Sequence, residues 1–436
     1  MRELSDMSLK AFVQNKVVRH LFGVTRRDAK RRNAEKKRQT QNAPHLVEYY
    51  HEAGDPYSHL MVQVLPAFCQ RYNVELKVYV VAPPPDWAAP DRGRLESYGR
   101  RDAQRLATRA GLEFTDPGKP PSDARIAATN EALLSAIADG AFLQRATDIG
   151  RQLWGVPLIE AAPVARPDVP QKLSAAATRR ESQGHYLGAT LYYGGEWYWG
   201  VDRLHYLERR LRDLGAANST KPDPIFAPPA VSASGGGPGL GKPVELYWYL
   251  SFRSPYTGIV ADRIKALADA YGAELKLRYV LPMVMRGMQV PRMKGFYIMS
   301  DTVREAERLG IPFGNMCDPV GQPVERGYAI LHKAIELGKG YAFAHSFLSG
   351  VWAEGIDAGS DRGLRKITER AGLSWSEMKP LLGGGHWRAD AEANQAEMFS
   401  HGVWGVPSFR VGNVAAWGQD RLWVIEDALK AIQRGE

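Results

Sequence analysis

The chain has 436 residues, of which 44% are hydrophobic and 24% charged, a composition typical of globular proteins and a length that favours two domains over one core. No apolar run approaches the ~20 residues that a membrane-spanning helix needs, and no apolar signal-like segment follows Met1. The two cysteines, Cys69 and Cys317, lie far apart and outside any Cys-x-x-Cys motif, which argues against a disulfide framework or a cysteine zinc site and predicts a cytoplasmic location.

The net charge of +9 is concentrated at the N-terminus. Residues 1–45 contain twelve Lys/Arg and four Asp/Glu, and the rest of the chain is close to neutral. We predict a basic N-terminal extension over residues 1–44 that is solvated and partly ordered. The alternative is that its loosely helical apolar residues pack on a domain or lie on an anionic surface. No aromatic-studded basic face follows, so specific nucleic-acid binding is not predicted.

Residues 45–81 match residues 244–280 without a gap, which indicates an internal repeat. In this match, Asp55-Pro56-Tyr57-Ser58 lies over Ser254-Pro255-Tyr256-Thr257. Each copy has the pattern of a strand, an N-capped helix and a second strand, which is the βαβ unit of a parallel sheet.

Later matches between the copies occur at other offsets: residues 154–157 with 404–407, and residues 199–204 with 417–422. Because the number of residues between the matched segments differs between the copies, we predict a helical insertion between Met299 and Met398 that the first copy has lost. The aromatic run before residue 199 predicts a hairpin around Gly194-Gly195. Between the copies, residues 217–243 are rich in Pro, Gly, Ala and Ser, which is typical of a linker.

Ser254 follows an apolar strand that spans Val244 to Leu250 and precedes a helical pattern that runs to Tyr271. We therefore predict that Ser254 is a helix N-cap, with Pro255 at the first helical position. A side chain there faces unpaired backbone N–H groups and the positive end of the helix dipole, which stabilise a thiolate or another anion. Disulfide oxidoreductases place a reactive cysteine at such a position, whereas this chain has a serine.

Five ordered motifs in the second copy resemble those of a known family: Ser254-Pro255-Tyr256, residues 292–297, residues 350–356, Gly405-Val406-Pro407 and residues 417–422. Together they are similar to the DsbA-like branch of the thioredoxin superfamily, and within it to 2-hydroxychromene-2-carboxylate isomerases and kappa-class glutathione transferases. The resemblance implies an α/β protein with two tandem thioredoxin-like domains, the C-terminal one carrying an all-helical insertion. The domains would span residues 45–216 and 244–436, the second being the active copy.

The resemblance also implies a glutathione site. Ser254 would donate a hydrogen bond to the glutathione sulfur and hold it as the thiolate, the form that is a good nucleophile. The remaining glutathione-binding residues would be Lys294, Val406, Gln419 and Asp420, with Pro407 as the structural cis-proline; no metal is implied. Met285 stands at the spacing where the family has an asparagine, and Gln289 is the alternative counterpart of that asparagine.

Each of these residues also has a purely structural interpretation. Ser254 and Asp420 are good helix caps, and Lys294 has the character of an exposed charge. The ordered joint occurrence of the motifs favours the functional interpretation.

The first copy differs at the key position, because Asp55 stands where Ser254 does. An ionised carboxylate cannot donate a hydrogen bond and would repel a thiolate. We predict a degenerate domain kept for packing, for pairing with the other copy within the chain, or for an unrelated ligand. Family members often form dimers, so a homodimer is the alternative to intramolecular pairing.

The sequence therefore predicts a glutathione-dependent isomerase or transferase acting on an apolar, electrophilic small molecule that is aromatic or unsaturated. Two other functions compete with it. A DsbA-like thiol-disulfide oxidoreductase requires two cysteines at the helix start, where this chain has Ser254 and Thr257. A non-catalytic thioredoxin-fold binding scaffold would bind no glutathione.

Overall fold

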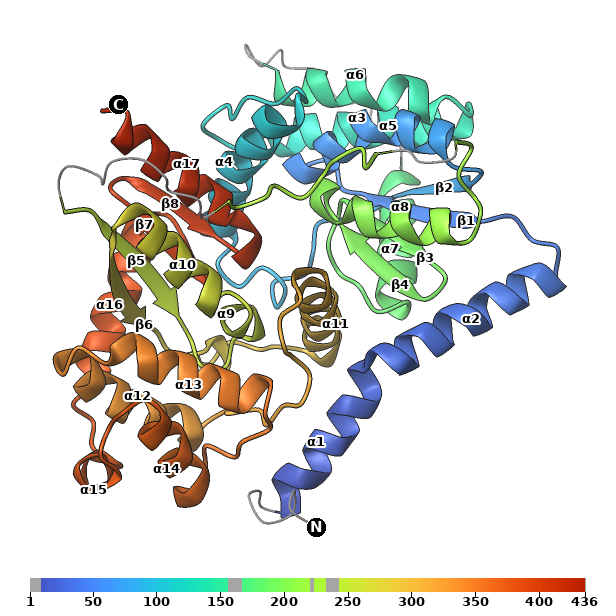
Figure 1. Cartoon of the computed structure of the whole chain (residues 1–436). Coiled ribbons are helices and arrows are strands. Elements are labelled where there is room, and N and C mark those ends of the chain that lie inside the picture. Colours follow the sequence, from blue (N-terminus) through green and yellow to red (C-terminus); the bar gives the residue numbers. More distant parts are fainter. Residues whose placement is uncertain (1–8, 156–166, 220–222, 233–242, 436) are drawn as a thin grey trace. The chain divides into compact units, whose positions relative to one another are not determined.

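The computed structural model describes residues 9–155, 167–219, 223–232 and 243–435 (Figure 1). The chain divides into two compact units. The N-terminal unit comprises residues 28–228 and 291–297, and the C-terminal unit comprises residues 1–27, 229–290 and 298–436. The main boundary therefore falls between Pro228 and Pro229, inside the stretch rich in Pro, Gly and Ser.

The N-terminal unit contains a four-stranded mixed sheet with the strand order β2-β1-β3-β4. Strands β1 and β2 are parallel, and the other pairs are antiparallel. Helix α3 contacts α8, and α7 contacts β2. The elements are β1 (Leu46–His51), α3 (Pro56–Arg71), β2 (Glu75–Val80), α4 (Arg92–Ala110), α5 (Asp123–Ala138), α6 (Phe142–Trp154), α7 (Val169–Ser182), β3 (Thr190–Tyr193), β4 (Glu196–Trp199) and α8 (Val201–Asp213).

Local sequence signals explain several of these elements. The carboxylate of Asp55 accepts hydrogen bonds from the backbone N–H groups of Tyr57 and Ser58, so it caps α3 as an N-cap aspartate should. Gly194 and Gly195 have φ angles of 51° and 87° and join β3 to β4. Such angles suit the tight turn of a two-residue hairpin, which confirms the hairpin predicted there.

The C-terminal unit contains a second mixed sheet with the same pattern, β6-β5-β7-β8, in which β5 and β6 are parallel. Helix α10 contacts α17, and α16 contacts β6. Its elements are β5 (Glu245–Leu250), α9 (Pro255–Gly258), α10 (Ala261–Tyr271), β6 (Glu274–Tyr279), η2 (Met283–Arg286), α11 (Arg292–Leu309), α12 (Gln322–Glu336), α13 (Gly340–Trp352), α14 (Asp361–Arg370), α15 (Trp375–Met378), η3 (Lys379–Leu381), α16 (Arg388–Ser400), β7 (Ser408–Val411), β8 (Val414–Trp417), η4 (Gln419–Arg421) and α17 (Leu422–Gln433). The helices between β6 and β7 confirm the predicted insertion; the first turn of α11 belongs to the N-terminal unit.

The prediction that the first copy has lost its helices is wrong. Four helices, α4 to α7, lie between β2 and β3. The hydroxyl of Tyr57 donates to Asp102 on α4 at 2.8 Å, and the hydroxyl of Tyr256 donates to Asp301 on α11 at 2.8 Å. Asp102 and Asp301 are as far apart in sequence as the two tyrosines, so α4 has the same place in its unit as α11. The prediction failed because residues 154–157 were aligned with residues 404–407, a correspondence that the sheet registers do not support.

The match between residues 154–157 and 404–407 is also wrong where the structure describes it. Trp154 ends α6, and Val156 and Pro157 lie outside the described residues. The sheet registers give a different correspondence, because Thr190 pairs with Tyr50 as Ser408 pairs with Tyr249. The position of Pro407 is therefore taken by Ala189, which has a positive φ of 52°.

The helix expected after Ser254 is interrupted. Helix α9 has four residues, and α10 starts at Ala261 after a turn, whereas α3 runs unbroken for 16 residues. A one-turn helix has a weak dipole, so an anion at Ser254 would rely on nearby N–H groups rather than on a macrodipole.

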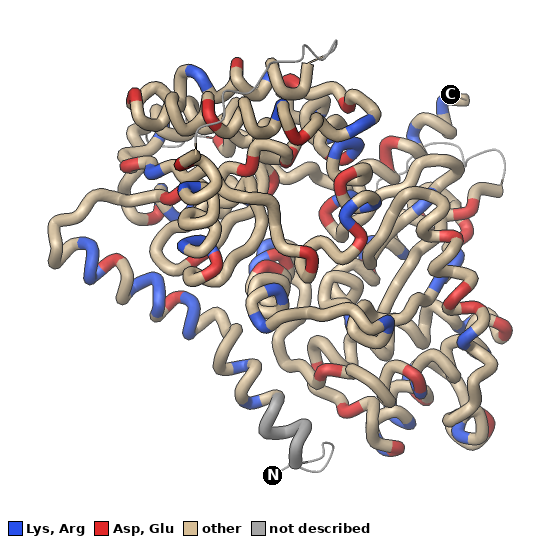
Figure 2. Tube along the Cα trace, turned by 180° about the vertical axis from the view of Figure 1, so that it is seen from behind, with Lys and Arg blue, Asp and Glu red and all other residues tan. Residues whose placement is uncertain are grey.

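The basic extension forms two helices, α1 (Leu9–Phe22) and α2 (Val24–Thr40), and Lys and Arg gather along α2 (Figure 2). In the C-terminal unit, Asn15 donates to the carbonyl of Met316 at 2.8 Å. In the N-terminal unit, Arg31 pairs with Glu196 at 2.5 Å. These contacts favour the packing alternative over a solvated tail.

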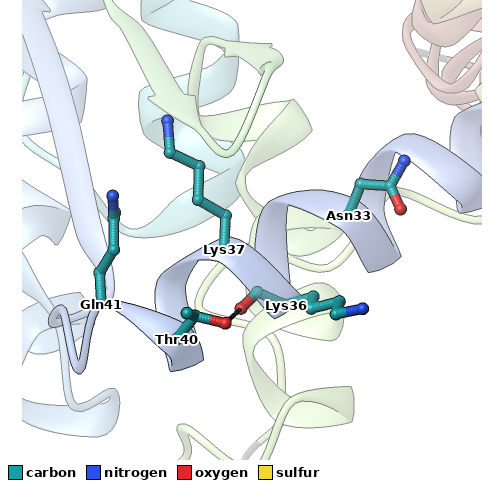
Figure 3. A pocket seen from close by; sticks show the side chains of 5 residues that line it. All are labelled: Asn33, Lys36, Lys37, Thr40 and Gln41. Atoms are coloured by element: carbon teal, nitrogen blue, oxygen red, sulfur yellow. Dashed lines mark hydrogen bonds between the residues drawn. The ribbon is translucent and has the colours of Figure 1, made fainter.

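A hollow beside the end of α2 is lined by Asn33, Lys36, Lys37, Thr40 and Gln41 (Figure 3). The Thr40 hydroxyl donates to the Lys36 carbonyl at 2.8 Å. All five residues come from α2 or the turn after it, so the hollow is a surface feature of one helix. In the described parts of the chain, no helix combines the length and apolar character needed to cross a membrane.

Candidate functional site

Ser254 lies at the N-cap of α9, as predicted. Its Oγ accepts a hydrogen bond from the backbone N–H of Thr257 at 3.2 Å and donates to the carbonyl of Val406 at 3.3 Å. The second bond is long, and the side chain is partly exposed, so the hydroxyl proton can be redirected to another acceptor. The bond from Thr257 polarises the hydroxyl and makes it a better donor.

The Val406–Pro407 peptide bond is cis, as expected, and lies directly before β7. The carbonyl of Pro407 accepts from the backbone N–H of Gly418 at 2.9 Å, which connects this loop to η4. Through these bonds the structure brings together Ser254, Val406 and the segment that carries Gln419 and Asp420.

Gly405 is required by packing, because a Cβ there would overlap the indole ring of Trp417. We expect Gly405→Ala to destabilise the C-terminal unit by about 1–3 kcal/mol, as overpacking of a filled core does. Chemical denaturation followed by circular dichroism measures this cost. Gly93→Ala is the control, because no atom lies within 4 Å of a Cβ at that helical position. Equal stability of the two variants would contradict the packing argument.

Gln419 is buried, with 1% of its surface exposed, and its amide is engaged inside the protein. Its Nε2 donates to Glu305 on α11 at 2.7 Å, and its Oε1 accepts from Arg263 on α10 at 2.7 Å. Arg308 pairs with the same glutamate at 2.9 Å. The Gln419 amide is therefore held by Arg263 and Glu305, and the glutathione contact predicted for Gln419 stays a prediction.

Among the described residues of the N-terminal unit, this polar network has no equivalent. The two units can be aligned through Tyr57 and Tyr256, through Asp102 and Asp301, and through β3 and β7. This alignment places Val64 at the position of Arg263, Leu106 at that of Glu305 and Val201 at that of Gln419. All three are apolar and no more than 4% exposed. Because apolar residues fill this place in one unit, the fold itself does not require the polar network.

Asp420 is partly exposed, and its Oδ2 pairs with Arg421 at 3.1 Å. A Cβ on Gly418 would meet its Oδ1 at 2.5 Å, so the carboxylate folds over that glycine. In the N-terminal unit, Asp202 and Arg203 form a similar pair at 3.4 Å. The repeated arrangement supports the structural interpretation of Asp420, and the glutathione contact predicted for its carboxylate stays a prediction.

Lys294 belongs to the segment of α11 that groups with the N-terminal unit. Its Nζ lies 3.5 Å from the carbonyl of Ala88, and only 8% of the residue is exposed. Burial lowers the pKa of Lys294 to about 8. The interpretation as a solvated surface charge is therefore wrong, and the glutathione contact predicted for Lys294 stays a prediction.

The two cysteines are poorly suited to thiol chemistry. Burial raises the pKa of Cys69 to about 11, and burial and nearby carboxylates raise that of Cys317 to about 12. Both are free thiols. Among the described residues, no group of three or more His, Cys, Asp or Glu is arranged to hold a metal ion.

Sequence reasoning missed Arg263 and Glu305. Neither lies in a motif, and they reach Gln419 only through packing of α10 and α11. One sequence signal could have found them. When α4 is aligned with α11, the charged Arg263 and Glu305 take the positions that the apolar Val64 and Leu106 have in the first copy.

A family model for the DSBA-like thioredoxin domain matches residues 245–430. A 2-hydroxychromene-2-carboxylate isomerase from Pseudomonas putida is 22% identical over 195 residues, which cover 43% of this chain and 95% of that protein. A solved structure of a 2-hydroxychromene-2-carboxylate isomerase is 22% identical, with a TM-score of 0.39 and coverage of 44% of this chain and 96% of that chain. A probable DsbA oxidoreductase from Streptomyces coelicolor is 20% identical, with a TM-score of 0.35 and coverage of 44% and 91%.

Proposed function

Because residues 245–430 form a DSBA-like thioredoxin domain distantly similar to 2-hydroxychromene-2-carboxylate isomerase, we propose that the C-terminal unit is a glutathione-dependent isomerase or transferase. The observation that carries the proposal is the Ser254 hydroxyl, which donates a long hydrogen bond to the Val406 carbonyl. A ligand can take the place of that carbonyl as the acceptor. A glutathione sulfur at this place would take that proton as its hydrogen bond.

The chemistry follows from the ionisation of the thiol. A free thiol with a pKa near ~8.5 is mostly protonated at neutral pH, and a hydrogen bond to the sulfur anion favours the thiolate. The thiolate then adds to an electrophilic carbon of an unsaturated substrate. In an isomerase the adduct allows rotation about the former double bond before glutathione leaves, and in a transferase it remains. Met283, Met285 and Met288, in and after η2, offer apolar and adaptable contacts for such a substrate.

Calorimetric titration of the full chain with glutathione and with S-methylglutathione tests the proposal. S-Methylglutathione keeps the peptide but cannot form a thiolate. We expect the wild type to prefer glutathione, and Ser254→Ala to reduce that preference by about tenfold to a hundredfold, the value of a hydrogen bond to a charged group. Absorbance of the bound thiolate near 240 nm gives its pKa directly. Equal affinities of the wild type for both ligands would contradict the proposal.

The thiol-disulfide alternative makes a different prediction. Because both thiols have raised pKa values, we expect the chain to reduce insulin disulfides no faster than the assay background. A Cys69→Ala/Cys317→Ala double variant should retain any isomerase or transferase activity. Disulfide reduction that the double variant loses would favour the oxidoreductase.

A further inference from the structure

The network of Arg263, Gln419 and Glu305 has no evident purpose for stability. Gln419 and Glu305 are 1% exposed, and burial lowers the pKa of Arg263. Apolar residues at the matched positions of the N-terminal unit fill the same space. Buried polar networks commonly add less stability than well-packed apolar residues would.

The network is placed so that it fixes the backbone that carries Asp420. Arg263 donates to the Gln419 side chain at 2.7 Å and also to its backbone carbonyl at 3.2 Å, the carbonyl of the peptide unit that leads into Asp420. Glu305 holds the other end of the amide. The Asp420 carboxylate lies within electrostatic reach of the Arg263 guanidinium. These contacts hold the peptide unit that leads into Asp420, and Arg263 adds a positive charge to the surroundings of the Asp420 carboxylate.

We infer that Arg263 and Glu305 are positioning residues that act through Gln419 to hold Asp420 where it pairs with the ammonium group of a bound γ-glutamyl thiol. The inference rests on the proposed function. It assigns the network to recognition of the γ-glutamyl end, whereas Ser254 acts on the sulfur. The contributions of the two groups to affinity can therefore be measured separately with ligands that lack one end of glutathione.

The experiment compares glutathione with cysteinylglycine, which keeps the thiol and lacks the γ-glutamyl group. The variant Arg263→Val/Glu305→Leu/Gln419→Val installs the residues found at the matched positions of the N-terminal unit. We expect the wild type to prefer glutathione by roughly tenfold to a hundredfold, as one charge-assisted contact provides. The triple variant should fold normally and discriminate by less than about threefold.

Two further variants distinguish a positioning role of the network from a general loss of structure. Ser254→Ala should weaken both ligands and keep their ratio, because it affects only the sulfur. Glu305→Gln should retain most of the preference, because its side-chain oxygen still accepts from Gln419. If the triple variant fails to fold, Arg263→Met, at a partly exposed position, replaces it with the same expected loss of preference.

The outcomes are distinguishable. A triple or Arg263→Met variant that folds and keeps the wild-type preference overturns the inference while the proposed function stands. A wild type that binds both thiols equally also overturns it, because no γ-glutamyl recognition would then exist. A wild type that binds neither thiol overturns the proposed function and the inference with it.

Discussion

Ser254→Asp is expected to abolish glutathione binding at neutral pH. The substitution installs the residue that the N-terminal unit has at the matched position, where Asp55 caps α3 with its carboxylate. A second negative charge about 4 Å from a thiolate costs about 4 kcal/mol at the dielectric typical of a protein surface, which corresponds to roughly a thousandfold loss. Folding should be preserved, because aspartate is among the best N-cap residues.

Ser254→Asn is the matched control for that experiment. Asparagine has nearly the same shape as aspartate, caps helices equally well and carries no charge. Its amide retains a donor, so we expect a loss closer to that of Ser254→Ala. Calorimetry with glutathione at neutral pH gives both affinities, and thermal unfolding checks the fold. If the Asp and Asn variants lose affinity equally, repulsion of a thiolate is not the cause, and the sulfur is not bound beside residue 254.

Local sequence signals predicted the parts of the site that depend on neighbouring residues. Ser254 followed by Pro255 indicates an N-cap, and the structure confirms it. The cis bond before Pro407 was also expected, although only from the family resemblance. The strand, helix and strand pattern of each copy predicted two sheets, and the two have the same strand order.

The signals failed where packing between distant segments decides the structure. The partners of the Gln419 amide were not predicted, because the sequence does not show that Arg263 and Glu305 pack against it. The break between α9 and α10 was also missed, because the apolar spacing continues across the turn. The helices of the first copy were missed because its few landmarks were aligned at the wrong offset.

Arg180→Met is expected to stabilise the N-terminal unit. Arg180, on α7, has no exposed surface, and none of its side-chain nitrogens has a hydrogen-bond partner among the described residues. The β3 and β7 registers match it with Met398, which is also fully buried. Replacing a buried charge by a packed apolar residue of similar size is often stabilising by about 1–4 kcal/mol.

Of the two carboxylates that act on the Arg180 charge, Glu52 has a larger effect than Glu181, but burial and the nearby Asp55 raise the pKa of Glu52 to about 8. At pH 6.5 this carboxyl is mostly protonated and offers Arg180 no countercharge. The stabilisation should therefore be largest below pH 7. It should shrink above pH 8, where Glu52 ionises in the folded state and the methionine variant leaves that carboxylate without its cation.

Arg179→Met, one residue earlier on α7, is the matched control with the opposite expected sign. Arg179 forms an ion pair with Glu48, a carboxylate that is only 4% exposed, so its removal leaves a buried acceptor without its cation at a cost of about 1–3 kcal/mol. Denaturant unfolding and amide hydrogen exchange of α7, each at pH 6.5 and pH 9, measure both variants. Destabilisation by Arg180→Met at pH 6.5 would show that the guanidinium has a stabilising partner, and an equal effect at both pH values would exclude Glu52 from that role.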